Sequence, residues 1–237
     1  MKLESLNARL RAIGVPGFTK LGLSSKGEIV IDEVMPNYVA IQDLFTIVTL
    51  LVTDPRTLAK KAHLLMHDHK ECCILAVLVN DEYLVTVRQH RLPWMRFLEE
   101  FARGWLTHEG PGSEPFQILE RELPNLQKLG KVVQVIDRGK FALDTSWRTG
   151  KTRIVILRVQ TFEPITSAEE FQTLLRQGTG KVIKPVLRHL DEVEEQFEKI
   201  TNGTNEQDWL QDIHSFSAWS SLSGYLDQQE TSERQEL

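Results

Sequence analysis

The chain has 237 residues, of which 41% are hydrophobic and 26% are charged, a composition typical of a globular protein that buries a sizeable core. Its formal net charge of -5 offers no broad basic surface, so no nucleic-acid partner is expected. The longest apolar stretch, residues 44–52, is far shorter than the roughly 20 residues that span a bilayer, so no membrane partner is expected either.

The first 60 residues are expected to form an N-terminal extension of helix and strand. Apolar residues at helical spacing predict a helix over residues 1–14. Loose alternation and many β-branched residues predict strands within residues 27–53, whereas residues 58–66 fit a strand or a short helix equally well. This extension contains no motif that indicates a binding or catalytic site.

Residues 61–226 are expected to form one domain, because no repeat or low-complexity linker divides them, and residues 227–237 are expected to form a polar tail. A buried strand is predicted from residue 72 to 79, with a hairpin turn at Asn80 and Asp81. Further strands are predicted at residues 83–89, 132–136 and 153–159, and helices at residues 113–129, 167–175, 190–200 and 208–225. The predicted fold class is therefore α/β (α+β).

The two cysteines, Cys72 and Cys73, are adjacent in an apolar run. Neighbouring side chains of a strand point to opposite faces of the sheet, so a disulfide between them is not expected, which favours a reducing compartment. The charged N-terminus lacks the apolar core of a secretory signal. The expected location is the cytoplasm.

Residues 87–130 have the order strand, loop, glutamate-rich strand end, glycine loop and helix. Three short segments here resemble motifs of the Nudix hydrolases, in the ADP-ribose pyrophosphatase-like branch: VRQHR at 87–91, EFARG at 100–104 and REL at 121–123. Residues 200–222 are similar to the C-terminal part of that branch. The resemblance covers roughly residues 60–225, and it implies a Nudix-like mixed β-sheet sandwiched between helices.

The resemblance also implies hydrolysis of a diphosphate with Mg²⁺, which prefers carboxylate and water ligands. In the family, three glutamates on one helix face supply the carboxylates, the second and third lying three and four residues after the first. Here Glu122 keeps the first, but Asn125 and Leu126 stand at the other two positions. An alternative register with a gap after Leu123 puts Leu126 and Gln127 there instead. Pro124 predicts that the helix ends or kinks at this point.

The resemblance assigns candidate roles to seven residues. Glu122 and Glu100 are the candidate catalytic residues, and with Glu114 they are the candidate Mg²⁺ ligands. The candidate ligand-binding residues are Gln89 and Arg91 on the first segment, Arg121 on the helix, and Trp105, whose ring is large enough to stack on a base. Five of them also have a structural explanation: Glu100 as a strand-end charge, Arg91 as a surface cation, Arg121 and Glu122 as solvent-facing helix charges, and Trp105 as a packed ring.

Three functions stay open at this point. The first is binding of a nucleoside-diphosphate-type small molecule resembling ADP-ribose, with weak or no hydrolysis and no required cofactor. The second is an active Mg²⁺-dependent nucleoside-diphosphate-sugar pyrophosphatase whose ligands have moved to Glu100, Glu114 and Glu122. The third is a non-enzymatic interaction or assembly protein, with residues 1–60 and 191–198 as partner surfaces. The resemblance further implies a homodimer that exchanges strands from residues 27–66.

Overall fold

The chain divides into two compact units, Met1–Glu71 with Asp144–Lys151, and Cys72–Leu143 with Thr152–Leu237. The computed structural model describes residues 8, 11–12, 30–41, 45–53, 57–68, 71–91, 96–105, 114–141, 152–177, 183–203 and 213–235. The sequence prediction placed the boundary after residue 60. The structure places it after Glu71, because residues 60–68 pair with a strand of the first unit.

The first unit contains a three-stranded antiparallel sheet in the order β1-β2-β3. Its strands are β1 (Val30–Ile41), β2 (Phe45–Thr53) and β3 (Lys60–Asp68). Alternate residues of β2, from Thr46 to Val52, are buried, as expected of a strand with one covered face. Residues 58–66 fitted a strand or a short helix equally well, and in the structure this stretch lies mostly in strand β3. Of the predicted helix over residues 1–14, only residues 8, 11 and 12 are described, and they are helical.

The second unit is built on a six-stranded mixed sheet in the order β7-β8-β4-β6-β5-β9. The strands are β4 (Cys72–Val79), β5 (Tyr83–Arg91), β6 (Arg96–Trp105), β7 (Gly130–Phe141), β8 (Thr152–Thr161) and β9 (Ile183–His189). All eight residues of β4 are buried, and β4 runs parallel to β8. The predicted hairpin joins β4 to β5 through Asn80 (φ 51°) and Asp81 (φ 58°), the left-handed conformations that tight hairpins favour.

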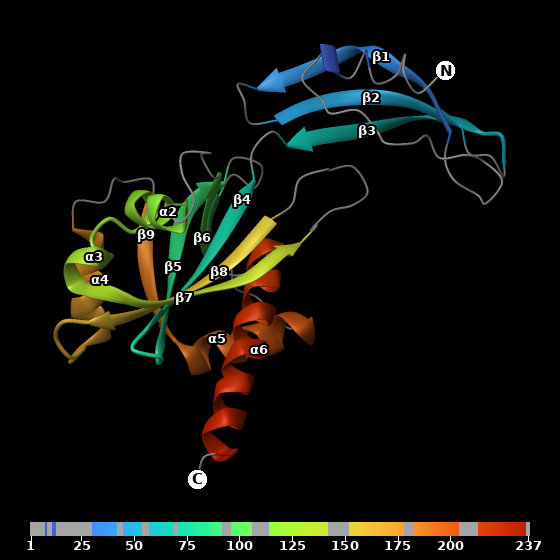
Figure 1. Ribbon diagram of the computed structural model, residues 1–237. Helices are drawn as coiled ribbons and strands as arrows, with labels where there is room; N and C mark the ends of the chain where they lie inside the picture. The colour runs from blue at the N-terminus through green and yellow to red at the C-terminus, as the bar shows by residue number, and fades with distance from the viewer. Residues whose placement is uncertain are drawn as a thin grey trace. The chain divides into compact units, whose positions relative to one another are not determined.

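Helices cover both faces of this sheet (Figure 1). They are α2 (Glu114–Glu122), α3 (Leu126–Leu129) and α4 (Ala168–Arg176), and then α5 (Leu190–Thr201) and α6 (Ile213–Gln235). On one face Leu75 and Val77 pack with Ile118 and Leu119 of α2. On the other face the alternate residues Ile74 and Ala76 pack in a separate core. That core includes residues of α5 and α6. This is the mixed α+β sandwich predicted from the sequence.

Several predicted elements differ from those observed. The predicted helix over 113–129 is two helices, because α2 ends at Glu122 and α3 begins at Leu126. Proline disfavours the α conformation in the residue before it, here Leu123, so Pro124 explains the break. The last helix runs on to Gln235 and takes in most of the predicted polar tail. Strand β9 was not predicted.

Two other predictions concern the cysteines and the bilayer. Cys72 and Cys73 are both buried, and they are not joined in a disulfide. Among the described residues, no helix has the length and apolar character needed to cross a bilayer.

Candidate functional site

The three segments that carry the resemblance are joined through β5, β6 and α2. Strand β6 pairs with β5 as far as Phe101 and with β4 from Ala102 onward. This arrangement lays Gln89 of β5 near Glu100 of β6, and the Gln89 side-chain amide donates a hydrogen bond to Glu100 Oε1. The segments VRQHR and EFARG are thus in direct contact.

Glu100 is buried, with 1% of its surface exposed, and it forms an ion pair with Arg103. Arg103 Nη2 lies 2.5 Å from Glu100 Oε2, and the Arg103 side chain is itself only 18% exposed. A buried carboxylate is costly unless it is paired and hydrogen-bonded, and Arg103 and Gln89 supply these contacts. The fold therefore uses both oxygens of Glu100.

Arg121 and Glu122 form the second ion pair of the site, at the end of α2. Arg121 Nε donates to Glu122 Oε1 at 2.9 Å, and the two side chains are 52% and 7% exposed. Arg121 also lies against the backbone of Gly104, where a Cβ atom would stand 1.8 Å from Arg121 Nη2. The absence of a side chain at Gly104 is what permits this approach. The segments EFARG and REL therefore meet through Arg121.

Asn125 and Leu126, which stand where the family has glutamates, serve the packing of the fold. The Asn125 side-chain amide donates to the carbonyl of Leu175 at 3.3 Å and also to the carbonyl of Gln177, at the end of α4. Its Oδ1 accepts a hydrogen bond from Lys128 Nζ at 3.2 Å. Leu126 is buried in the core on the same face as α2. The carboxylates that α2 can offer to a metal ion thus end with Glu122.

The remaining predicted residues lie around this cluster. Arg91 ends β5 opposite Arg96, and Glu114 begins α2, but the side chains of both lie outside the described residues. Trp105 ends β6 opposite Cys72 and is partly exposed. The structure therefore links the segments that carry Gln89, Glu100, Arg121 and Glu122 through direct contacts. Trp105 directly follows Gly104, the residue that Arg121 approaches.

The described donors do not fit a Mg²⁺ ion held by three carboxylates. Within the described part of the chain, no three His, Cys, Asp or Glu side chains converge on a common point. Glu100 and Glu122 are each bound to an arginine. Glu99, a neighbouring carboxylate, is bound instead by Arg188 at 2.7 Å and by Thr86 Oγ1 at 2.7 Å. These three carboxylates, Glu99, Glu100 and Glu122, are thus each paired with an arginine.

The sequence analysis missed the parts played by Arg103 and Asn125. Arg103 is three residues from Glu100, and strict strand alternation would put the two on opposite faces. They pair at the point where β6 changes its partner from β5 to β4, which no local pattern indicates. For Asn125 the signal was Pro124, because a helix that ends there turns the next side chain away from the face of Glu122.

No family model matches this chain, and no curated protein matches it. Among solved structures, it is similar to one described as an ADP compounds hydrolase, with a TM-score of 0.60 and 15% sequence identity. The similarity covers 90% of this chain and 98% of the other. At this identity the likeness concerns the fold. The chain has the mixed α+β, Nudix-like fold that its sequence motifs predicted.

Proposed function

We propose that the cluster formed by β5, β6 and α2 binds a nucleoside-diphosphate-type ligand resembling ADP-ribose, with weak or no hydrolysis. The observation that carries this proposal is the end of α2 at Glu122, followed by Asn125 bound to α4. The helix then presents one carboxylate where metal-dependent hydrolysis needs several. The fold supports the ligand class, because the similar solved structure is an ADP compounds hydrolase.

Arginine supplies the positive charge that a diphosphate requires. The Arg121 side chain is half exposed, and its planar guanidinium has donors beyond the Nε that binds Glu122. Guanidinium groups bind phosphate oxygens through paired, charge-assisted hydrogen bonds. In this proposal Arg121 contacts the diphosphate, Arg91 and Gln89 contact phosphate or ribose, and Trp105 stacks on the base. Binding of this kind does not depend on a divalent metal ion.

The alternative is an active Mg²⁺-dependent pyrophosphatase that uses Glu100, Glu114 and Glu122. It requires a metal ion to compete with Gln89 and Arg103 for the two oxygens of Glu100, and to share the nearly buried Glu122 with Arg121. Hydrogen bonds to charged groups contribute about 1.5–3 kcal/mol each, so the loss of these contacts is unfavourable without the metal. The pairing of both carboxylates favours binding over turnover.

A thermal-shift titration of the full chain with ADP-ribose, in EDTA and in Mg²⁺, tests the proposal. We expect the same stabilisation in both buffers, of about 2.7 kcal/mol when the ligand is at a hundred times its dissociation constant. Arg121→Ala should remove the shift. Lys131→Ala, which removes an exposed positive charge on β7, is the control and should keep it. Stabilisation that needs Mg²⁺, or an unchanged shift in Arg121→Ala, would count against the proposal.

A further inference from the structure

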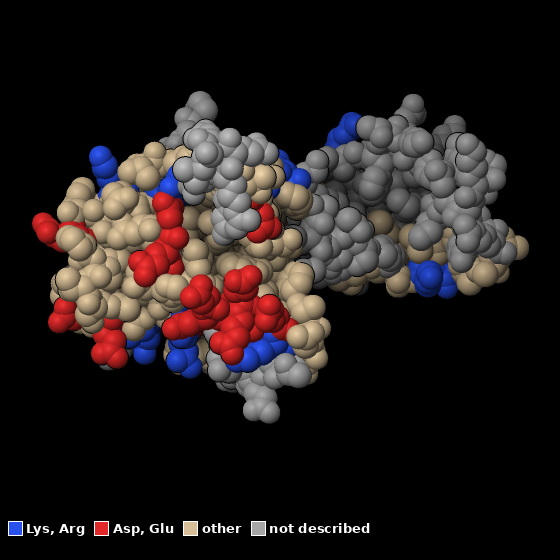
Figure 2. Space-filling view, turned by 90° about the horizontal axis from the view of Figure 1, so that it is seen from below, with Lys and Arg blue, Asp and Glu red and all other residues tan. Residues whose placement is uncertain are grey.

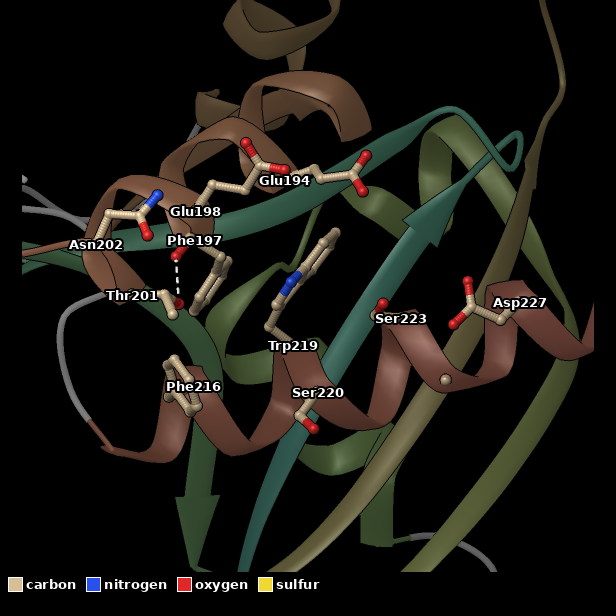
Figure 3. Close-up of a pocket in the computed structure, with 11 residues that line it drawn as sticks. Glu194, Phe197, Glu198, Thr201, Asn202, Phe216, Trp219, Ser220, Ser223 and Asp227 are labelled. Atoms are coloured by element: carbon tan, nitrogen blue, oxygen red, sulfur yellow. Dashed lines mark hydrogen bonds between the residues drawn. The ribbon is translucent and has the colours of Figure 1, made fainter.

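A cavity of about 740 Å³ lies between α5 and α6 (Figure 3). These two helices pack on the face of the sheet opposite to α2, so the cavity is separate from the candidate ligand site. Its lining comes from Glu194 to Thr201 of α5, from the adjoining Asn202, and from one side of α6. Nothing in the proposed function uses this surface.

Aromatic rings form the apolar part of the cavity. Phe197 of α5 and Trp219 of α6 are stacked, with ring centroids 5.2 Å apart and planes 3° from parallel. Phe216 meets Phe197 edge-on at 5.7 Å and is 45% exposed. Figure 3 shows Phe197 and Trp219 between the two helices. Phe197 is only 4% exposed, so the aromatic surface of the cavity comes mainly from Phe216 and the partly exposed Trp219. Aromatic surface attracts cations and the apolar stems of long side chains, so it suits a partner that carries both.

The charged part of the cavity is entirely acidic. Glu194 and Glu198 of α5 and Asp227 of α6 line it, and its described lining includes no Lys, Arg or His. Glu195 of α5, which does not line the cavity, has its charge balanced by Lys199, whose Nζ lies 2.6 Å from Glu195 Oε1. Figure 2 shows acidic side chains gathered on the side where α5 and α6 lie in Figure 1. The three carboxylates at the cavity thus have no Lys, Arg or His beside them among the described lining residues.

The position of these carboxylates on α5 is unfavourable without a cation. Glu194 and Glu198 are four residues apart, so the two like charges are neighbours on the helix surface. Glu198 also lies in the last turn of α5, near the negative end of the helix dipole, which favours a positive charge. A bound cation would relieve both effects, and this charge complementarity identifies the partner's chemistry.

We propose that this cavity binds a segment of a partner protein that presents lysine or arginine side chains next to apolar ones. The α6 side of the cavity extends from Phe216 to Asp227, which is about 16 Å at the rise of an α-helix. That length suits a peptide segment better than a single small cation. Between these two residues the lining includes Gly224, where an added Cβ would meet nothing within 4 Å, so a partner chain has room to approach. The binding mode would be that of a segment in a helical groove.

Selection of random dodecapeptides displayed on phage, with the full chain as target, tests this inference. The enriched peptides should combine Lys or Arg with aliphatic residues. Fluorescence anisotropy with one such peptide should then show at least about tenfold weaker binding to Glu194→Gln/Glu198→Gln, because charges facing a bound cation are lost. Gly224→Leu, which fills open space, should weaken binding similarly. Glu192→Gln/Glu195→Gln removes two carboxylates of the same helix outside the cavity lining and should stay within about twofold.

Several results would overturn the inference. One is enrichment of peptides without basic residues, or no enrichment at all. Another is equal binding of the selected peptide to the wild-type chain and the double glutamine variant, which decides the matter even if Gly224→Leu does not fold. Spermidine that displaces the peptide and binds as tightly would instead indicate a site for small cations. Self-association in sedimentation that is lost in the double variant would indicate a second copy as the occupant.

Discussion

Gly104 is the residue whose side chain, if it had one, would collide with the guanidinium of Arg121. We predict that Gly104→Ala pushes Arg121 away from the site. The free energy of unfolding should change by less than about 1 kcal/mol, because the atoms that must move are at the far end of a flexible side chain. The affinity for ADP-ribose should fall by about tenfold, as Arg121 loses its position.

Calorimetric titration of Gly104→Ala with ADP-ribose, together with urea denaturation, measures the two effects separately. Gly203→Ala is not a suitable control, because Gly203 has a positive φ of 68° that alanine would strain. Lys131→Ala serves again as the control outside the site. An affinity equal to that of the wild-type chain would show that Arg121 does not contact the ligand from its present position.

Asp137 of β7 and Arg153 of β8 form an ion pair outside the candidate site. Arg153 Nη2 lies 2.7 Å from Asp137 Oδ2, and this hydrogen bond holds the pKa of Asp137 below its usual value. Because the pKa of Asp137 is lower in the folded chain, the pair stabilises the folded chain in full at pH values above the ordinary pKa of aspartate. The contribution is lost as the pH falls through the lowered value.

We therefore predict that Asp137→Asn is less stable than the wild-type chain at neutral pH, and that the difference shrinks on acidification. The pair is partly exposed, so the difference at pH 7 should be less than about 1 kcal/mol. Urea titrations of both chains from about pH 6 to about pH 3 provide the measurement. A difference that stays constant over this range would contradict the assignment.

At the scale of elements, Asn125 links the end of α2 to the end of α4. Its buried amide donates to two carbonyls there, those of Leu175 and Gln177. We predict that Asn125→Ala lowers the free energy of unfolding by about 1–3 kcal/mol, since buried acceptors lose their donors. Urea denaturation measures the loss. Gln127→Ala, two residues away and exposed, should change stability by less than about 0.5 kcal/mol, and an equal effect of both would refute the link.

The elements that the sequence predicted are those with strong local signals. The buried run of β4 and the turn at Asn80 and Asp81 specify a hairpin within a few residues of each other. The helix predicted from residue 167 begins where Ser167, a favoured N-cap residue type, accepts a hydrogen bond from the backbone N–H of Glu170. In these cases the residues that determine the structure are neighbours in the chain.

The parts that the sequence did not predict depend on contacts between distant residues. Strand β9 contains Pro185 and charged residues, so it reads poorly as a strand, yet it pairs with β5 at the edge of the sheet, where proline is tolerated. The pairing of Glu100 with Arg103 depends on where β6 changes partners. In the candidate site, the motifs identified the segments, but the sequence did not show that these segments meet through Gln89 and Arg121. The motifs also did not predict that Arg103 would bind Glu100 or that Arg121 would bind Glu122.

At the scale of the whole molecule, the second unit has the cores it needs to fold alone. Both of its apolar clusters consist only of residues from this unit. We predict that a chain lacking Met1–Glu71 unfolds cooperatively on heating and binds ADP-ribose with an affinity within about threefold of the full chain. Circular dichroism and calorimetry measure these properties. A truncated chain that fails to fold would show that the first unit, or strand exchange through it, is required.

The fold and the chemistry of this molecule are separable, since one fold can host many functions and the side chains of a site decide its chemistry. The central claim is that the site binds a nucleoside diphosphate through arginine and turns it over weakly or not at all. Calorimetric titration of the full chain with ADP-ribose in EDTA, followed by analysis of the ligand after incubation with Mg²⁺, tests it most directly. We predict binding without metal and an essentially intact ligand. Binding only in Mg²⁺, with rapid hydrolysis that Glu122→Gln abolishes, would contradict it.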